Sequence, residues 1–312
     1  MPDVNSEKAP LNKKPFSTKR SFSEKKKEAL AGYLYISPFF ILFAIFGLFP
    51  ILFSFYLGFH RWNGFGEMEY VGFKNFSLIL SDPLFWKSLS NTIIMWILGT
   101  LPQLLIGIIL AYALNATIIK FKSIFRVSVF MPYVTSTVAV AIVFGIMFND
   151  QPFGLFNIII GWFGVDPINW STSDWGLKIA ISTMVFWRWV GYNTIIYLAG
   201  LQAIPGELYE AATIDGATTR QKIQYITIPM LKPIIILTVF TSTIGALQLF
   251  TEPLIMVGRT YREEGLTVVL YLYREAFNNM AFGTASATAI ILFLIIIVLS
   301  SINVFIANRI GK

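Results

Sequence analysis

The sequence contains no cysteine and only one histidine, His60, among its 312 residues. Without cysteine the chain can form neither disulfides nor thiolate metal sites, and a single histidine excludes a multi-histidine metal cluster or a histidine proton relay. Charge is also scarce: 13% of the residues are charged, where a soluble domain has about a quarter. Because a soluble globule must cover itself with polar groups, this deficit indicates a protein surrounded by lipid.

Long hydrophobic runs replace the missing charge, since 55% of the residues are hydrophobic. A helix needs about 20 apolar residues to cross a bilayer, and several stretches reach that length. They predict an all-α membrane protein with six transmembrane helices, near residues 33–58, 90–114, 125–148, 177–201, 233–256 and 284–307. Prolines such as Pro132 and Pro253 fall inside the spans, where neighbouring helices can satisfy the carbonyls that they free. We expect kinks at these prolines.

The net charge of +7 is distributed unevenly along the chain. Eight of the 24 Lys and Arg residues precede the first span, and we predict that residues 1–29 form a disordered basic cytosolic tail. In total, 16 of the 24 fall on the side of this tail and seven on the other, with Arg188 inside a span. The positive-inside rule therefore predicts that the N- and C-termini are both cytosolic. No aromatic-rich basic groove accompanies the charge, which argues against nucleic-acid binding.

The most informative polar segment is the predicted cytosolic loop 203–231. Pro205 suits the first turn of a helix, where its missing N–H costs nothing, and Asp215-Gly216 can supply the left-handed turn that ends this helix. Thr218-x-x-Gln221 indicates a capping box that begins a second helix. Small and acidic side chains on such an elbow are typical of a docking surface, and a solvated amphipathic loop is the alternative. The candidate contact residues are Glu210, Ala211, Ala212, Asp215 and Gly216.

This segment resembles the EAA loop of binding-protein-dependent ABC transporter permeases, through Glu210-Ala211-Ala212-x3-Gly216-x9-Ile226-x-Ile228-Pro229. The flanking Gly191-Tyr192, Ile204-Pro205 and Ser37-Pro38-Phe39 are similar to the carbohydrate-uptake branch of that family. The resemblance implies a type I importer permease of a bacterial inner membrane, with residues 30–312 as its six-span domain. It also implies three partners besides the lipid bilayer: a second homologous permease, a cytosolic ABC ATPase dimer and an extracytoplasmic solute-binding protein. In this family the elbow is a coupling helix that inserts into a cleft on the ATPase.

The chain itself carries no G-x-x-x-x-G-K-[ST] motif, so it cannot bind ATP through a P-loop. We therefore expect a transport subunit that is not an enzyme and holds no cofactor or metal. Its energy has to arrive from the ATPase, whose closure on ATP moves permeases of the resembling family from an inward-open to an outward-open state.

Polar and aromatic side chains within the fourth and fifth spans mark the candidate solute path, because such groups usually face a cavity or another helix. Aromatic faces beside amides suit sugars, although packing or lipid contact is the alternative for each aromatic residue. Arg188 and Glu252 either pair across the bundle or reach the outer interface. The candidates are Trp187, Trp189, Tyr192, Asn193, Gln248, Phe250 and Glu252. In the resembling permeases these two spans contact the substrate, here expected to be an oligosaccharide.

Two other classes of protein compete with this interpretation. A secondary transporter of a small polar solute needs coupling carboxylates near the middle of the membrane, where Glu252 is nearly alone and close to a span end. A membrane-embedded enzyme needs clustered acids and bases, which the spans lack.

Overall fold

The computed structural model describes residues 22–116, 120–258 and 262–309. The chain divides into two units between Phe53 and Ser54, and each is described by itself. The first unit contains helix α1 (Phe22–Phe43), a π-helical turn (Ala44–Leu48) and the beginning of α2 (Phe49–Gly58), which continues into the second unit. Residues 22–29, predicted to be disordered, are therefore helical, and the rest of the predicted tail lies outside the described residues.

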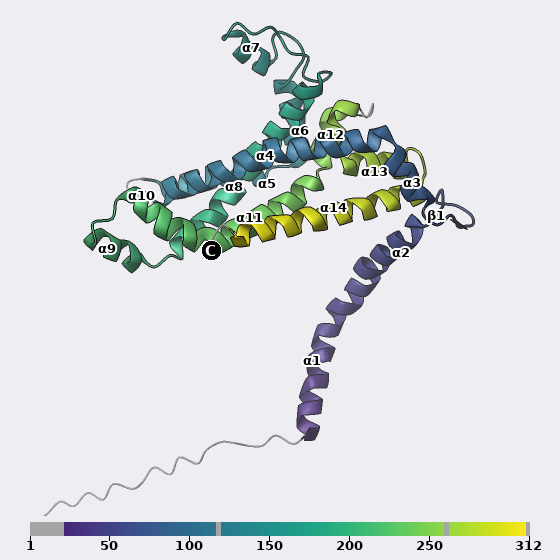
Figure 1. Ribbon diagram of the computed structural model, residues 1–312, viewed down its shortest axis with the longest axis horizontal. Helices are drawn as coiled ribbons and strands as arrows, with labels where there is room; N and C mark the ends of the chain where they lie inside the picture. The colour runs from purple at the N-terminus through teal and green to yellow at the C-terminus, as the bar shows by residue number, and fades with distance from the viewer. Residues whose placement is uncertain (1–21, 117–119, 259–261, 310–312) are drawn as a thin grey trace, which may run out of the picture. The chain divides into compact units, whose positions relative to one another are not determined.

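The second unit holds the remaining elements, which are almost all helical (Figure 1). A short antiparallel pair, β1 (His60–Arg61) and β2 (Glu69–Tyr70), follows α2, with His60 opposite Tyr70. The helices are α3 (Lys74–Ser81), α4 (Pro83–Asn115), α5 (Lys122–Val134), α6 (Thr137–Met147), α7 (Leu155–Gly161), α8 (Asp174–Gln202), α9 (Gly206–Ile214), α10 (Thr219–Lys222), α11 (Ile228–Leu247), α12 (Thr251–Val257), α13 (Val268–Phe277) and α14 (Phe282–Arg309). A π-helical segment (Ile223–Thr227) joins α10 to α11, and a 3₁₀ turn (Glu263–Gly265) precedes α13.

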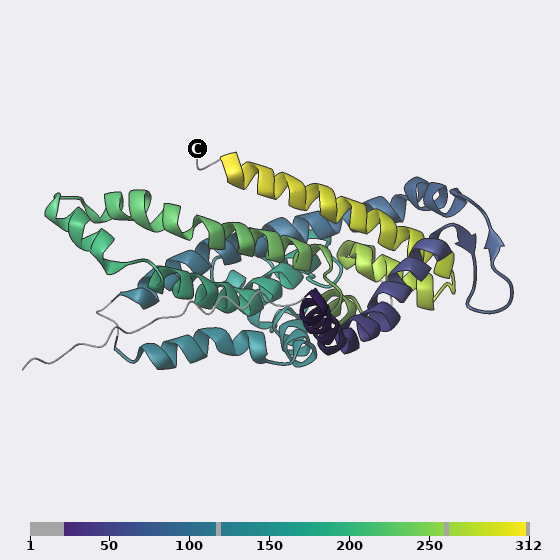
Figure 2. The ribbon, with the colours of Figure 1, turned by 90° about the horizontal axis from the view of Figure 1, so that it is seen from below.

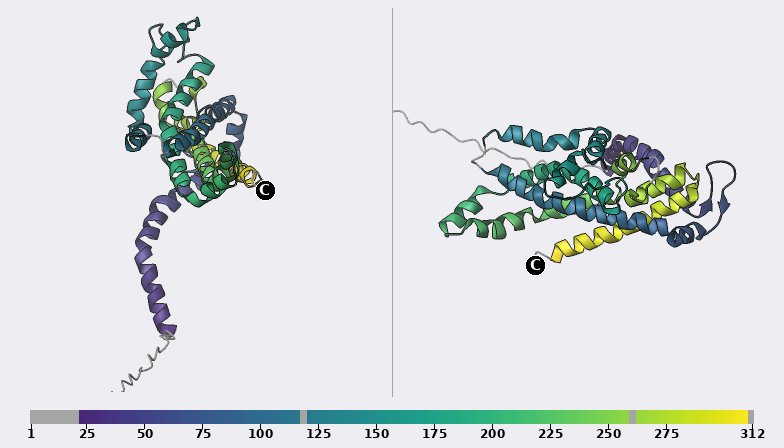
Figure 3. Two further views of the ribbon diagram at one scale, coloured as in Figure 1. Left: turned by 90° about the vertical axis from the view of Figure 1, so that its left-hand side faces the viewer. Right: turned by 90° about the horizontal axis from the view of Figure 1, so that it is seen from above.

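Helices occupy all six predicted spans, but not all of them are single apolar rods. Among the described residues, four helical stretches are long and apolar enough to cross a membrane: Ala29–Gly58, Pro83–Asn115, Thr219–Val257 and Phe282–Ile306. A fifth is obtained only if α5 and α6 are counted as one span, because they are bent by 91° at Thr135–Ser136 (Figures 2 and 3). The predicted span 125–148, in which a kink was expected at Pro132, thus consists of two helices with a sharp bend between them, and α8 is not apolar enough to qualify.

Helices α4 and α8 form the centre of the second unit and run parallel to each other. Their contact depends on small residues: a Cβ added at Gly99 of α4 would lie 3.4 Å from the carbonyl oxygen of Ser182, and one at Gly107 would lie 3.4 Å from Cβ of Asn193. Such close approach is typical of helix packing inside a membrane, where dispersion replaces the hydrophobic effect. Sixteen of the residues of α8 are consequently buried, and this burial positions the side chains of the candidate path.

Several of the connections lie at one or the other end of the second unit. The α9–α10 elbow, the start of α5 and the end of α14 point toward one end, whereas β1, α3 and α13 lie at the other (Figures 1 and 2). At the second end Asp82 caps α4 by accepting from the N–H of Leu84 at 2.9 Å, and the hydroxyl of Tyr271 donates to the same carboxylate at 2.7 Å. Helix α13 is therefore tied to the beginning of α4.

Candidate coupling elbow and solute path

The elbow between α8 and α11 has the local structure that its sequence predicts. Helix α9 ends in a Schellman motif: the N–H of Ala217 donates to the carbonyl of Ala212 at 2.9 Å, and the N–H of Gly216 donates to that of Thr213 at 3.1 Å. Gly216 has φ of +75°, a left-handed conformation that costs glycine nothing. The predicted capping box is also present, because Thr218 and Gln221 bond reciprocally at the start of α10.

Side-chain bonds make this elbow a fixed frame. The Tyr209 hydroxyl lies 2.9 Å from that of Thr227, which joins α9 to the segment leading into α11. Across the elbow, the ammonium group of Lys222 donates to the hydroxyl of Thr213 at 2.7 Å. The two arms of the elbow are thus held together without help from another chain.

The outer surface of α9 and its turn is open. Glu210, Ala211, Asp215 and Gly216 are exposed, and Ala212 is half-buried. Beside them the side chain of Ile214 is 87% exposed. A rigid surface that combines a fully presented aliphatic side chain, small residues and two carboxylates is what a protein partner can bury. All five candidate contact residues therefore lie in one short stretch of surface.

A cavity of about 230 Å³, lined by polar, aromatic and aliphatic side chains, lies between α4, α5, α8 and α11. Two of the predicted path residues line it, Trp189 and Tyr192 of α8, and their rings pack edge to face with centroids 5.6 Å apart. Tyr133 of α5 completes an aromatic wall, with its centroid 4.7 Å from that of Tyr192 and 5.2 Å from that of Trp189. The other lining residues are Thr100, Gln103, Val185, Thr241, Ser242, Gly245, Ala246 and Leu249.

The polar wall of this cavity includes residues that the sequence analysis missed. Thr100 and Gln103 belong to α4 and are almost completely buried. The hydroxyl of Thr100 and the carboxamide oxygen of Gln103 have no hydrogen-bond partner in the described part of the chain. Because buried polar atoms are nearly always paired in native structures, such orphans need a ligand or water. The cavity thus offers unused hydrogen-bonding groups opposite aromatic faces.

The remaining candidates do not converge on the cavity. Trp187 faces a separate, almost wholly apolar groove against α6, where its ring centroid is 5.6 Å from that of Phe144. Gln248 borders another apolar groove, of about 870 Å³, between α11 and α14. Phe250 packs against Tyr273 with centroids 5.2 Å apart. These residues occupy three different places.

Asn193 lies beside the cavity but does not line it. It is fully buried against α4, and its side-chain nitrogen donates to the carbonyl of Trp189 at 3.3 Å. Its side-chain oxygen has no partner in the described residues.

Glu252 forms a buried ion pair with Arg188, one of the two alternatives that the sequence left open. An Nη atom of Arg188 donates to Oε1 of Glu252 at 2.8 Å, and both residues are less than a tenth exposed. The pair joins the middle of α8 to the first turn of α12.

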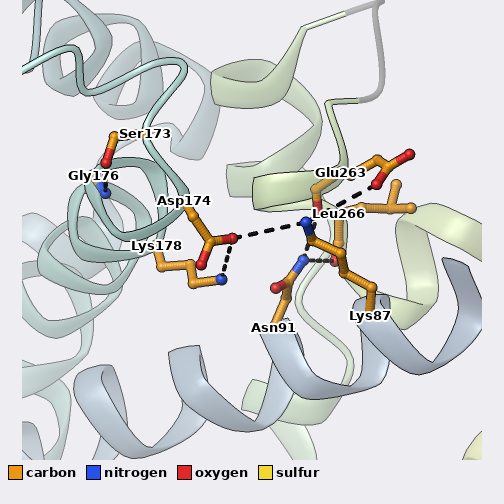
Figure 4. Close-up of polar contacts among 8 residues, drawn as sticks. All are labelled: Lys87, Asn91, Ser173, Asp174, Gly176, Lys178, Glu263 and Leu266. Atoms are coloured by element: carbon orange, nitrogen blue, oxygen red, sulfur yellow. Dashed lines mark hydrogen bonds and ion pairs between the residues drawn. The ribbon is translucent and has the colours of Figure 1, made fainter. Parts of the chain in front are cut away.

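A second group of polar contacts lies at the N-terminal end of α8 (Figure 4). Buried Lys178 donates to Asp174 at 2.7 Å, and Lys87 of α4 lies 3.9 Å from the same carboxylate. Asn91 of α4 donates to the backbone carbonyls of Glu263 and Leu266. This network ties the connection after α12 to both central helices, and nothing in the local sequence pattern indicated it.

Several helices long and apolar enough to cross a membrane, an exposed elbow and a cavity between the helices are typical of membrane transport components. Residues 103–312 match the family described as "Binding-protein-dependent transport system inner membrane component". The chain belongs to this family.

Individual relatives extend the match to nearly the whole chain. The lactose transport system permease protein LacF of Rhizobium radiobacter is 37% identical, over 94% of this chain and 99% of the relative. The arabinooligosaccharides transport system permease protein AraP of Halalkalibacterium halodurans is 33% identical, over 94% and 92%. A similar solved structure is a bacterial ABC transporter involved in the import of the acidic polysaccharide alginate, with a TM-score of 0.79 and 25% identity over 93% of this chain and 99% of that one.

Proposed function

We propose that this chain is a permease subunit of an ATP-driven ABC importer that translocates a neutral saccharide across the inner membrane of a bacterial cell. Membership of the binding-protein-dependent family supports an importer, and relatives named for lactose and arabinooligosaccharides support a sugar. The observation that carries the proposal is the rigid, exposed elbow at Glu210–Gly216, because a chain without a P-loop needs a surface that receives force from an ATPase.

The membrane arrangement in this proposal has six spans, with α8 and the bent α5–α6 pair counted among them, and both termini in the cytosol. The elbow then faces the cytosol, where an ATPase dimer can reach it. Six helices are few to enclose a path for a sugar, so a second, homologous permease completes the wall. An extracytoplasmic binding protein delivers the solute, as a similar alginate transporter structure contains a periplasmic binding protein with a bound pentasaccharide.

The cavity between α4, α5, α8 and α11 is the proposed contact with the solute. Its aromatic wall suits the C–H faces of a sugar ring, and the amide of Gln103 and the hydroxyls of Thr100 and Ser242 suit its rim. None of the lining residues is charged, which favours a neutral sugar over an acidic one. The volume is below the roughly 300 Å³ at which pockets for larger ligands begin, so we expect an oligosaccharide to be held by one ring at a time.

The coupling half of the proposal is tested by combining Glu210→Lys with Gly216→Pro. Proline cannot adopt the φ of +75° at this turn, and the lysine reverses the charge of the exposed contact surface. We expect loss of ATPase copurification and of sugar uptake, while the permease still accumulates in the membrane. The matched control is Glu67→Lys, a charge reversal on the exposed β1–β2 connection at the opposite end of the second unit. Normal uptake and ATPase binding in the double variant would refute the coupling assignment.

The solute contact is tested by Gln103→Leu in a sugar-uptake assay. Loss of one hydrogen bond, about 0.5–1.5 kcal/mol, should raise the half-saturating concentration of solute between about two- and tenfold. Gln248→Leu changes the same side chain at the apolar groove and should leave this concentration unchanged. Equal effects of the two substitutions would remove the cavity from the path.

Secondary transport remains the competing proposal and makes a different prediction. An ion-driven carrier would take up solute in vesicles that hold an ion gradient but no ATPase. We expect no uptake under these conditions.

A further inference from the structure

Among the ion pairs of the described residues, Arg188–Glu252 is the one in which both side chains are buried. Arg188 is the central residue of α8, about 21 Å from either end of this helix at roughly 1.5 Å per residue. Both side chains are buried, and charges at such a depth are costly to keep and are usually functional. Neither residue lines the cavity, so a place in the cavity wall does not account for the two charges.

On the side of Glu252, the pair lies next to a break in the fifth predicted span. Helix α11 ends at Leu247 and α12 begins at Thr251, and Glu252 lies directly after this break. The carbonyl of Leu249, inside the break, accepts a hydrogen bond from the hydroxyl of Thr267 at 2.8 Å. Helix α12 is therefore a separate short rod, and the ion pair attaches it to α8.

The cavity wall includes a residue close in sequence to each member of the ion pair. On α8, Trp189 directly follows Arg188 and lines the cavity; across the break, Leu249 lines it three residues before Glu252. Movement of α12 away from α8 would therefore displace the part of the wall that Leu249 forms.

The geometry of the pair is incomplete for a purely structural contact. Arginine and carboxylate groups frequently pair through two parallel hydrogen bonds, whereas here one Nη–Oε1 contact is made and Nε of Arg188 is buried without a partner among the described residues. A buried group with an unsatisfied donor makes the present, paired arrangement less stable. An arrangement in which this donor gains a partner is favoured by comparison.

From these observations we infer that Arg188 and Glu252 form a latch that holds α12 against α8 and closes the outer side of the solute path, and that the pair separates when the path opens outward. The inference rests on the proposed importer function. It assigns a positioning role to both residues, because they act through the cavity wall and not by touching the solute.

The absence of cysteine provides a direct test, since Ser242→Cys places the only thiol of the chain in the cavity. Membrane vesicles containing the complete transporter without ATP are treated with a membrane-impermeant thiol reagent from the outer side. We compare the labelling rate in three backgrounds: the natural pair, the apolar double variant Arg188→Met/Glu252→Met, and the reversed pair Arg188→Glu/Glu252→Arg.

A latch predicts that the apolar double variant is labelled at least about fivefold faster than the natural pair, the lower end of typical coupling between two states. The complex carrying it should also hydrolyse ATP without solute, and the reversed pair should restore both protection and solute dependence. A merely structural pair predicts otherwise, because replacing a buried ion pair by apolar residues is often neutral. Unchanged labelling in the apolar variant would overturn the latch.

Two further variants keep the test decisive. If the apolar variant does not assemble, Arg188→Gln/Glu252→Gln supplies an uncharged pair, and labelling equal to that of the natural pair would again overturn the inference. The exposed Arg61–Glu69 pair, at 3.4 Å, is the matched control, and Arg61→Met/Glu69→Met should change nothing. The proposed function fails by a different result, namely uptake by the natural chain without its ATPase.

Discussion

Replacing glycine by alanine at three helix positions should change the stability of the protein by three different amounts, according to the space beside each glycine. Gly191 of α8 lies against the backbone of α5: a Cβ added there would overlap the carbonyl oxygen of Val129 and lie 2.7 Å from its carbonyl carbon. A backbone carbonyl cannot rotate away, so Gly191→Ala must push α5 and α8 apart. Overpacking of this kind costs about 1–3 kcal/mol.

The chain contains two suitable comparisons. At Gly200 an added Cβ would meet only the ends of the Ile234 and Leu231 side chains, the latter at 2.8 Å, which can change rotamer. At Gly145, inside α6, nothing lies within 4 Å. Gly145→Ala should therefore stabilise its helix by about 0.5–1 kcal/mol, and Gly200→Ala should fall between the other two variants.

Reversible unfolding of the purified protein in detergent measures this series. We expect the free energies of unfolding of Gly145→Ala and Gly191→Ala to differ by about 1.5–4 kcal/mol. Gly191→Ala should also impair uptake, because the α5–α8 contact sets the position of Tyr133 against Tyr192 in the cavity. If Gly191→Ala proved as stable as Gly145→Ala, the packing of α5 on α8 described here would be wrong.

Three other predictions concern the ends of the bundle. Asn157→Leu removes the acceptor of the N–H of Ile168 and of the indole N–H of Trp170. Leaving these two donors unpaired costs about 2–6 kcal/mol. Limited proteolysis should therefore cleave the connection 149–173 faster in the variant. Gly216→Ala forces a left-handed conformation on alanine at a cost of about 1–2 kcal/mol, which should weaken ATPase copurification by about five- to thirtyfold if the turn must keep its shape. Burial raises the pKa of Glu275 above its ordinary value. The folded protein therefore binds the carboxyl proton of Glu275 more tightly than the unfolded chain does. The free energy of unfolding should fall as the pH rises from the ordinary carboxyl pKa through the raised one. Denaturation at several pH values should show a smaller decrease across that interval for Glu275→Gln.

The elbow was predictable because its signals are local. The capping box of Thr218 and Gln221 and the left-handed Gly216 depend on residues within one or two turns of each other, and the structure confirms both. Exposure of the contact residues follows from the same short segment. The partner that covers them is not encoded there, so ATPase coupling stays a prediction.

The helix breaks were not predictable from proline. Kinks were expected at Pro132 and Pro253, but α5 continues to Val134 before it ends, and Pro253 sits in the first turn of α12, where proline is tolerated. The break that matters precedes Pro253 and is stabilised by the distant hydroxyl of Thr267. A contact 18 residues away in sequence leaves no mark in the hydropathy of the span.

The candidate path was predicted only in part, because a single sequence does not show which face of a polar helix points inward. Trp187 and Trp189 differ by two positions, which places them on different faces of α8: one lies at an apolar groove and the other in the cavity. Gln103 was not among the candidates because it lies in α4. This helix was predicted as a span from its apolar composition, and its few polar residues were not considered for the path.

Helix α8 shows how buried polar residues can keep a membrane-length helix from qualifying as an apolar span. The helix is long enough to cross a bilayer but carries Arg188, Asn193 and Thr194, all buried. A lipid-facing helix could not hold these residues, so α8 must be surrounded by other helices, as its packing against α4, α5 and α12 shows. The same polar groups that remove it from the apolar helices provide the latch and border the cavity. In a bundle of this kind, the least apolar of the membrane-length helices is therefore the one to mutate first in a search for the path.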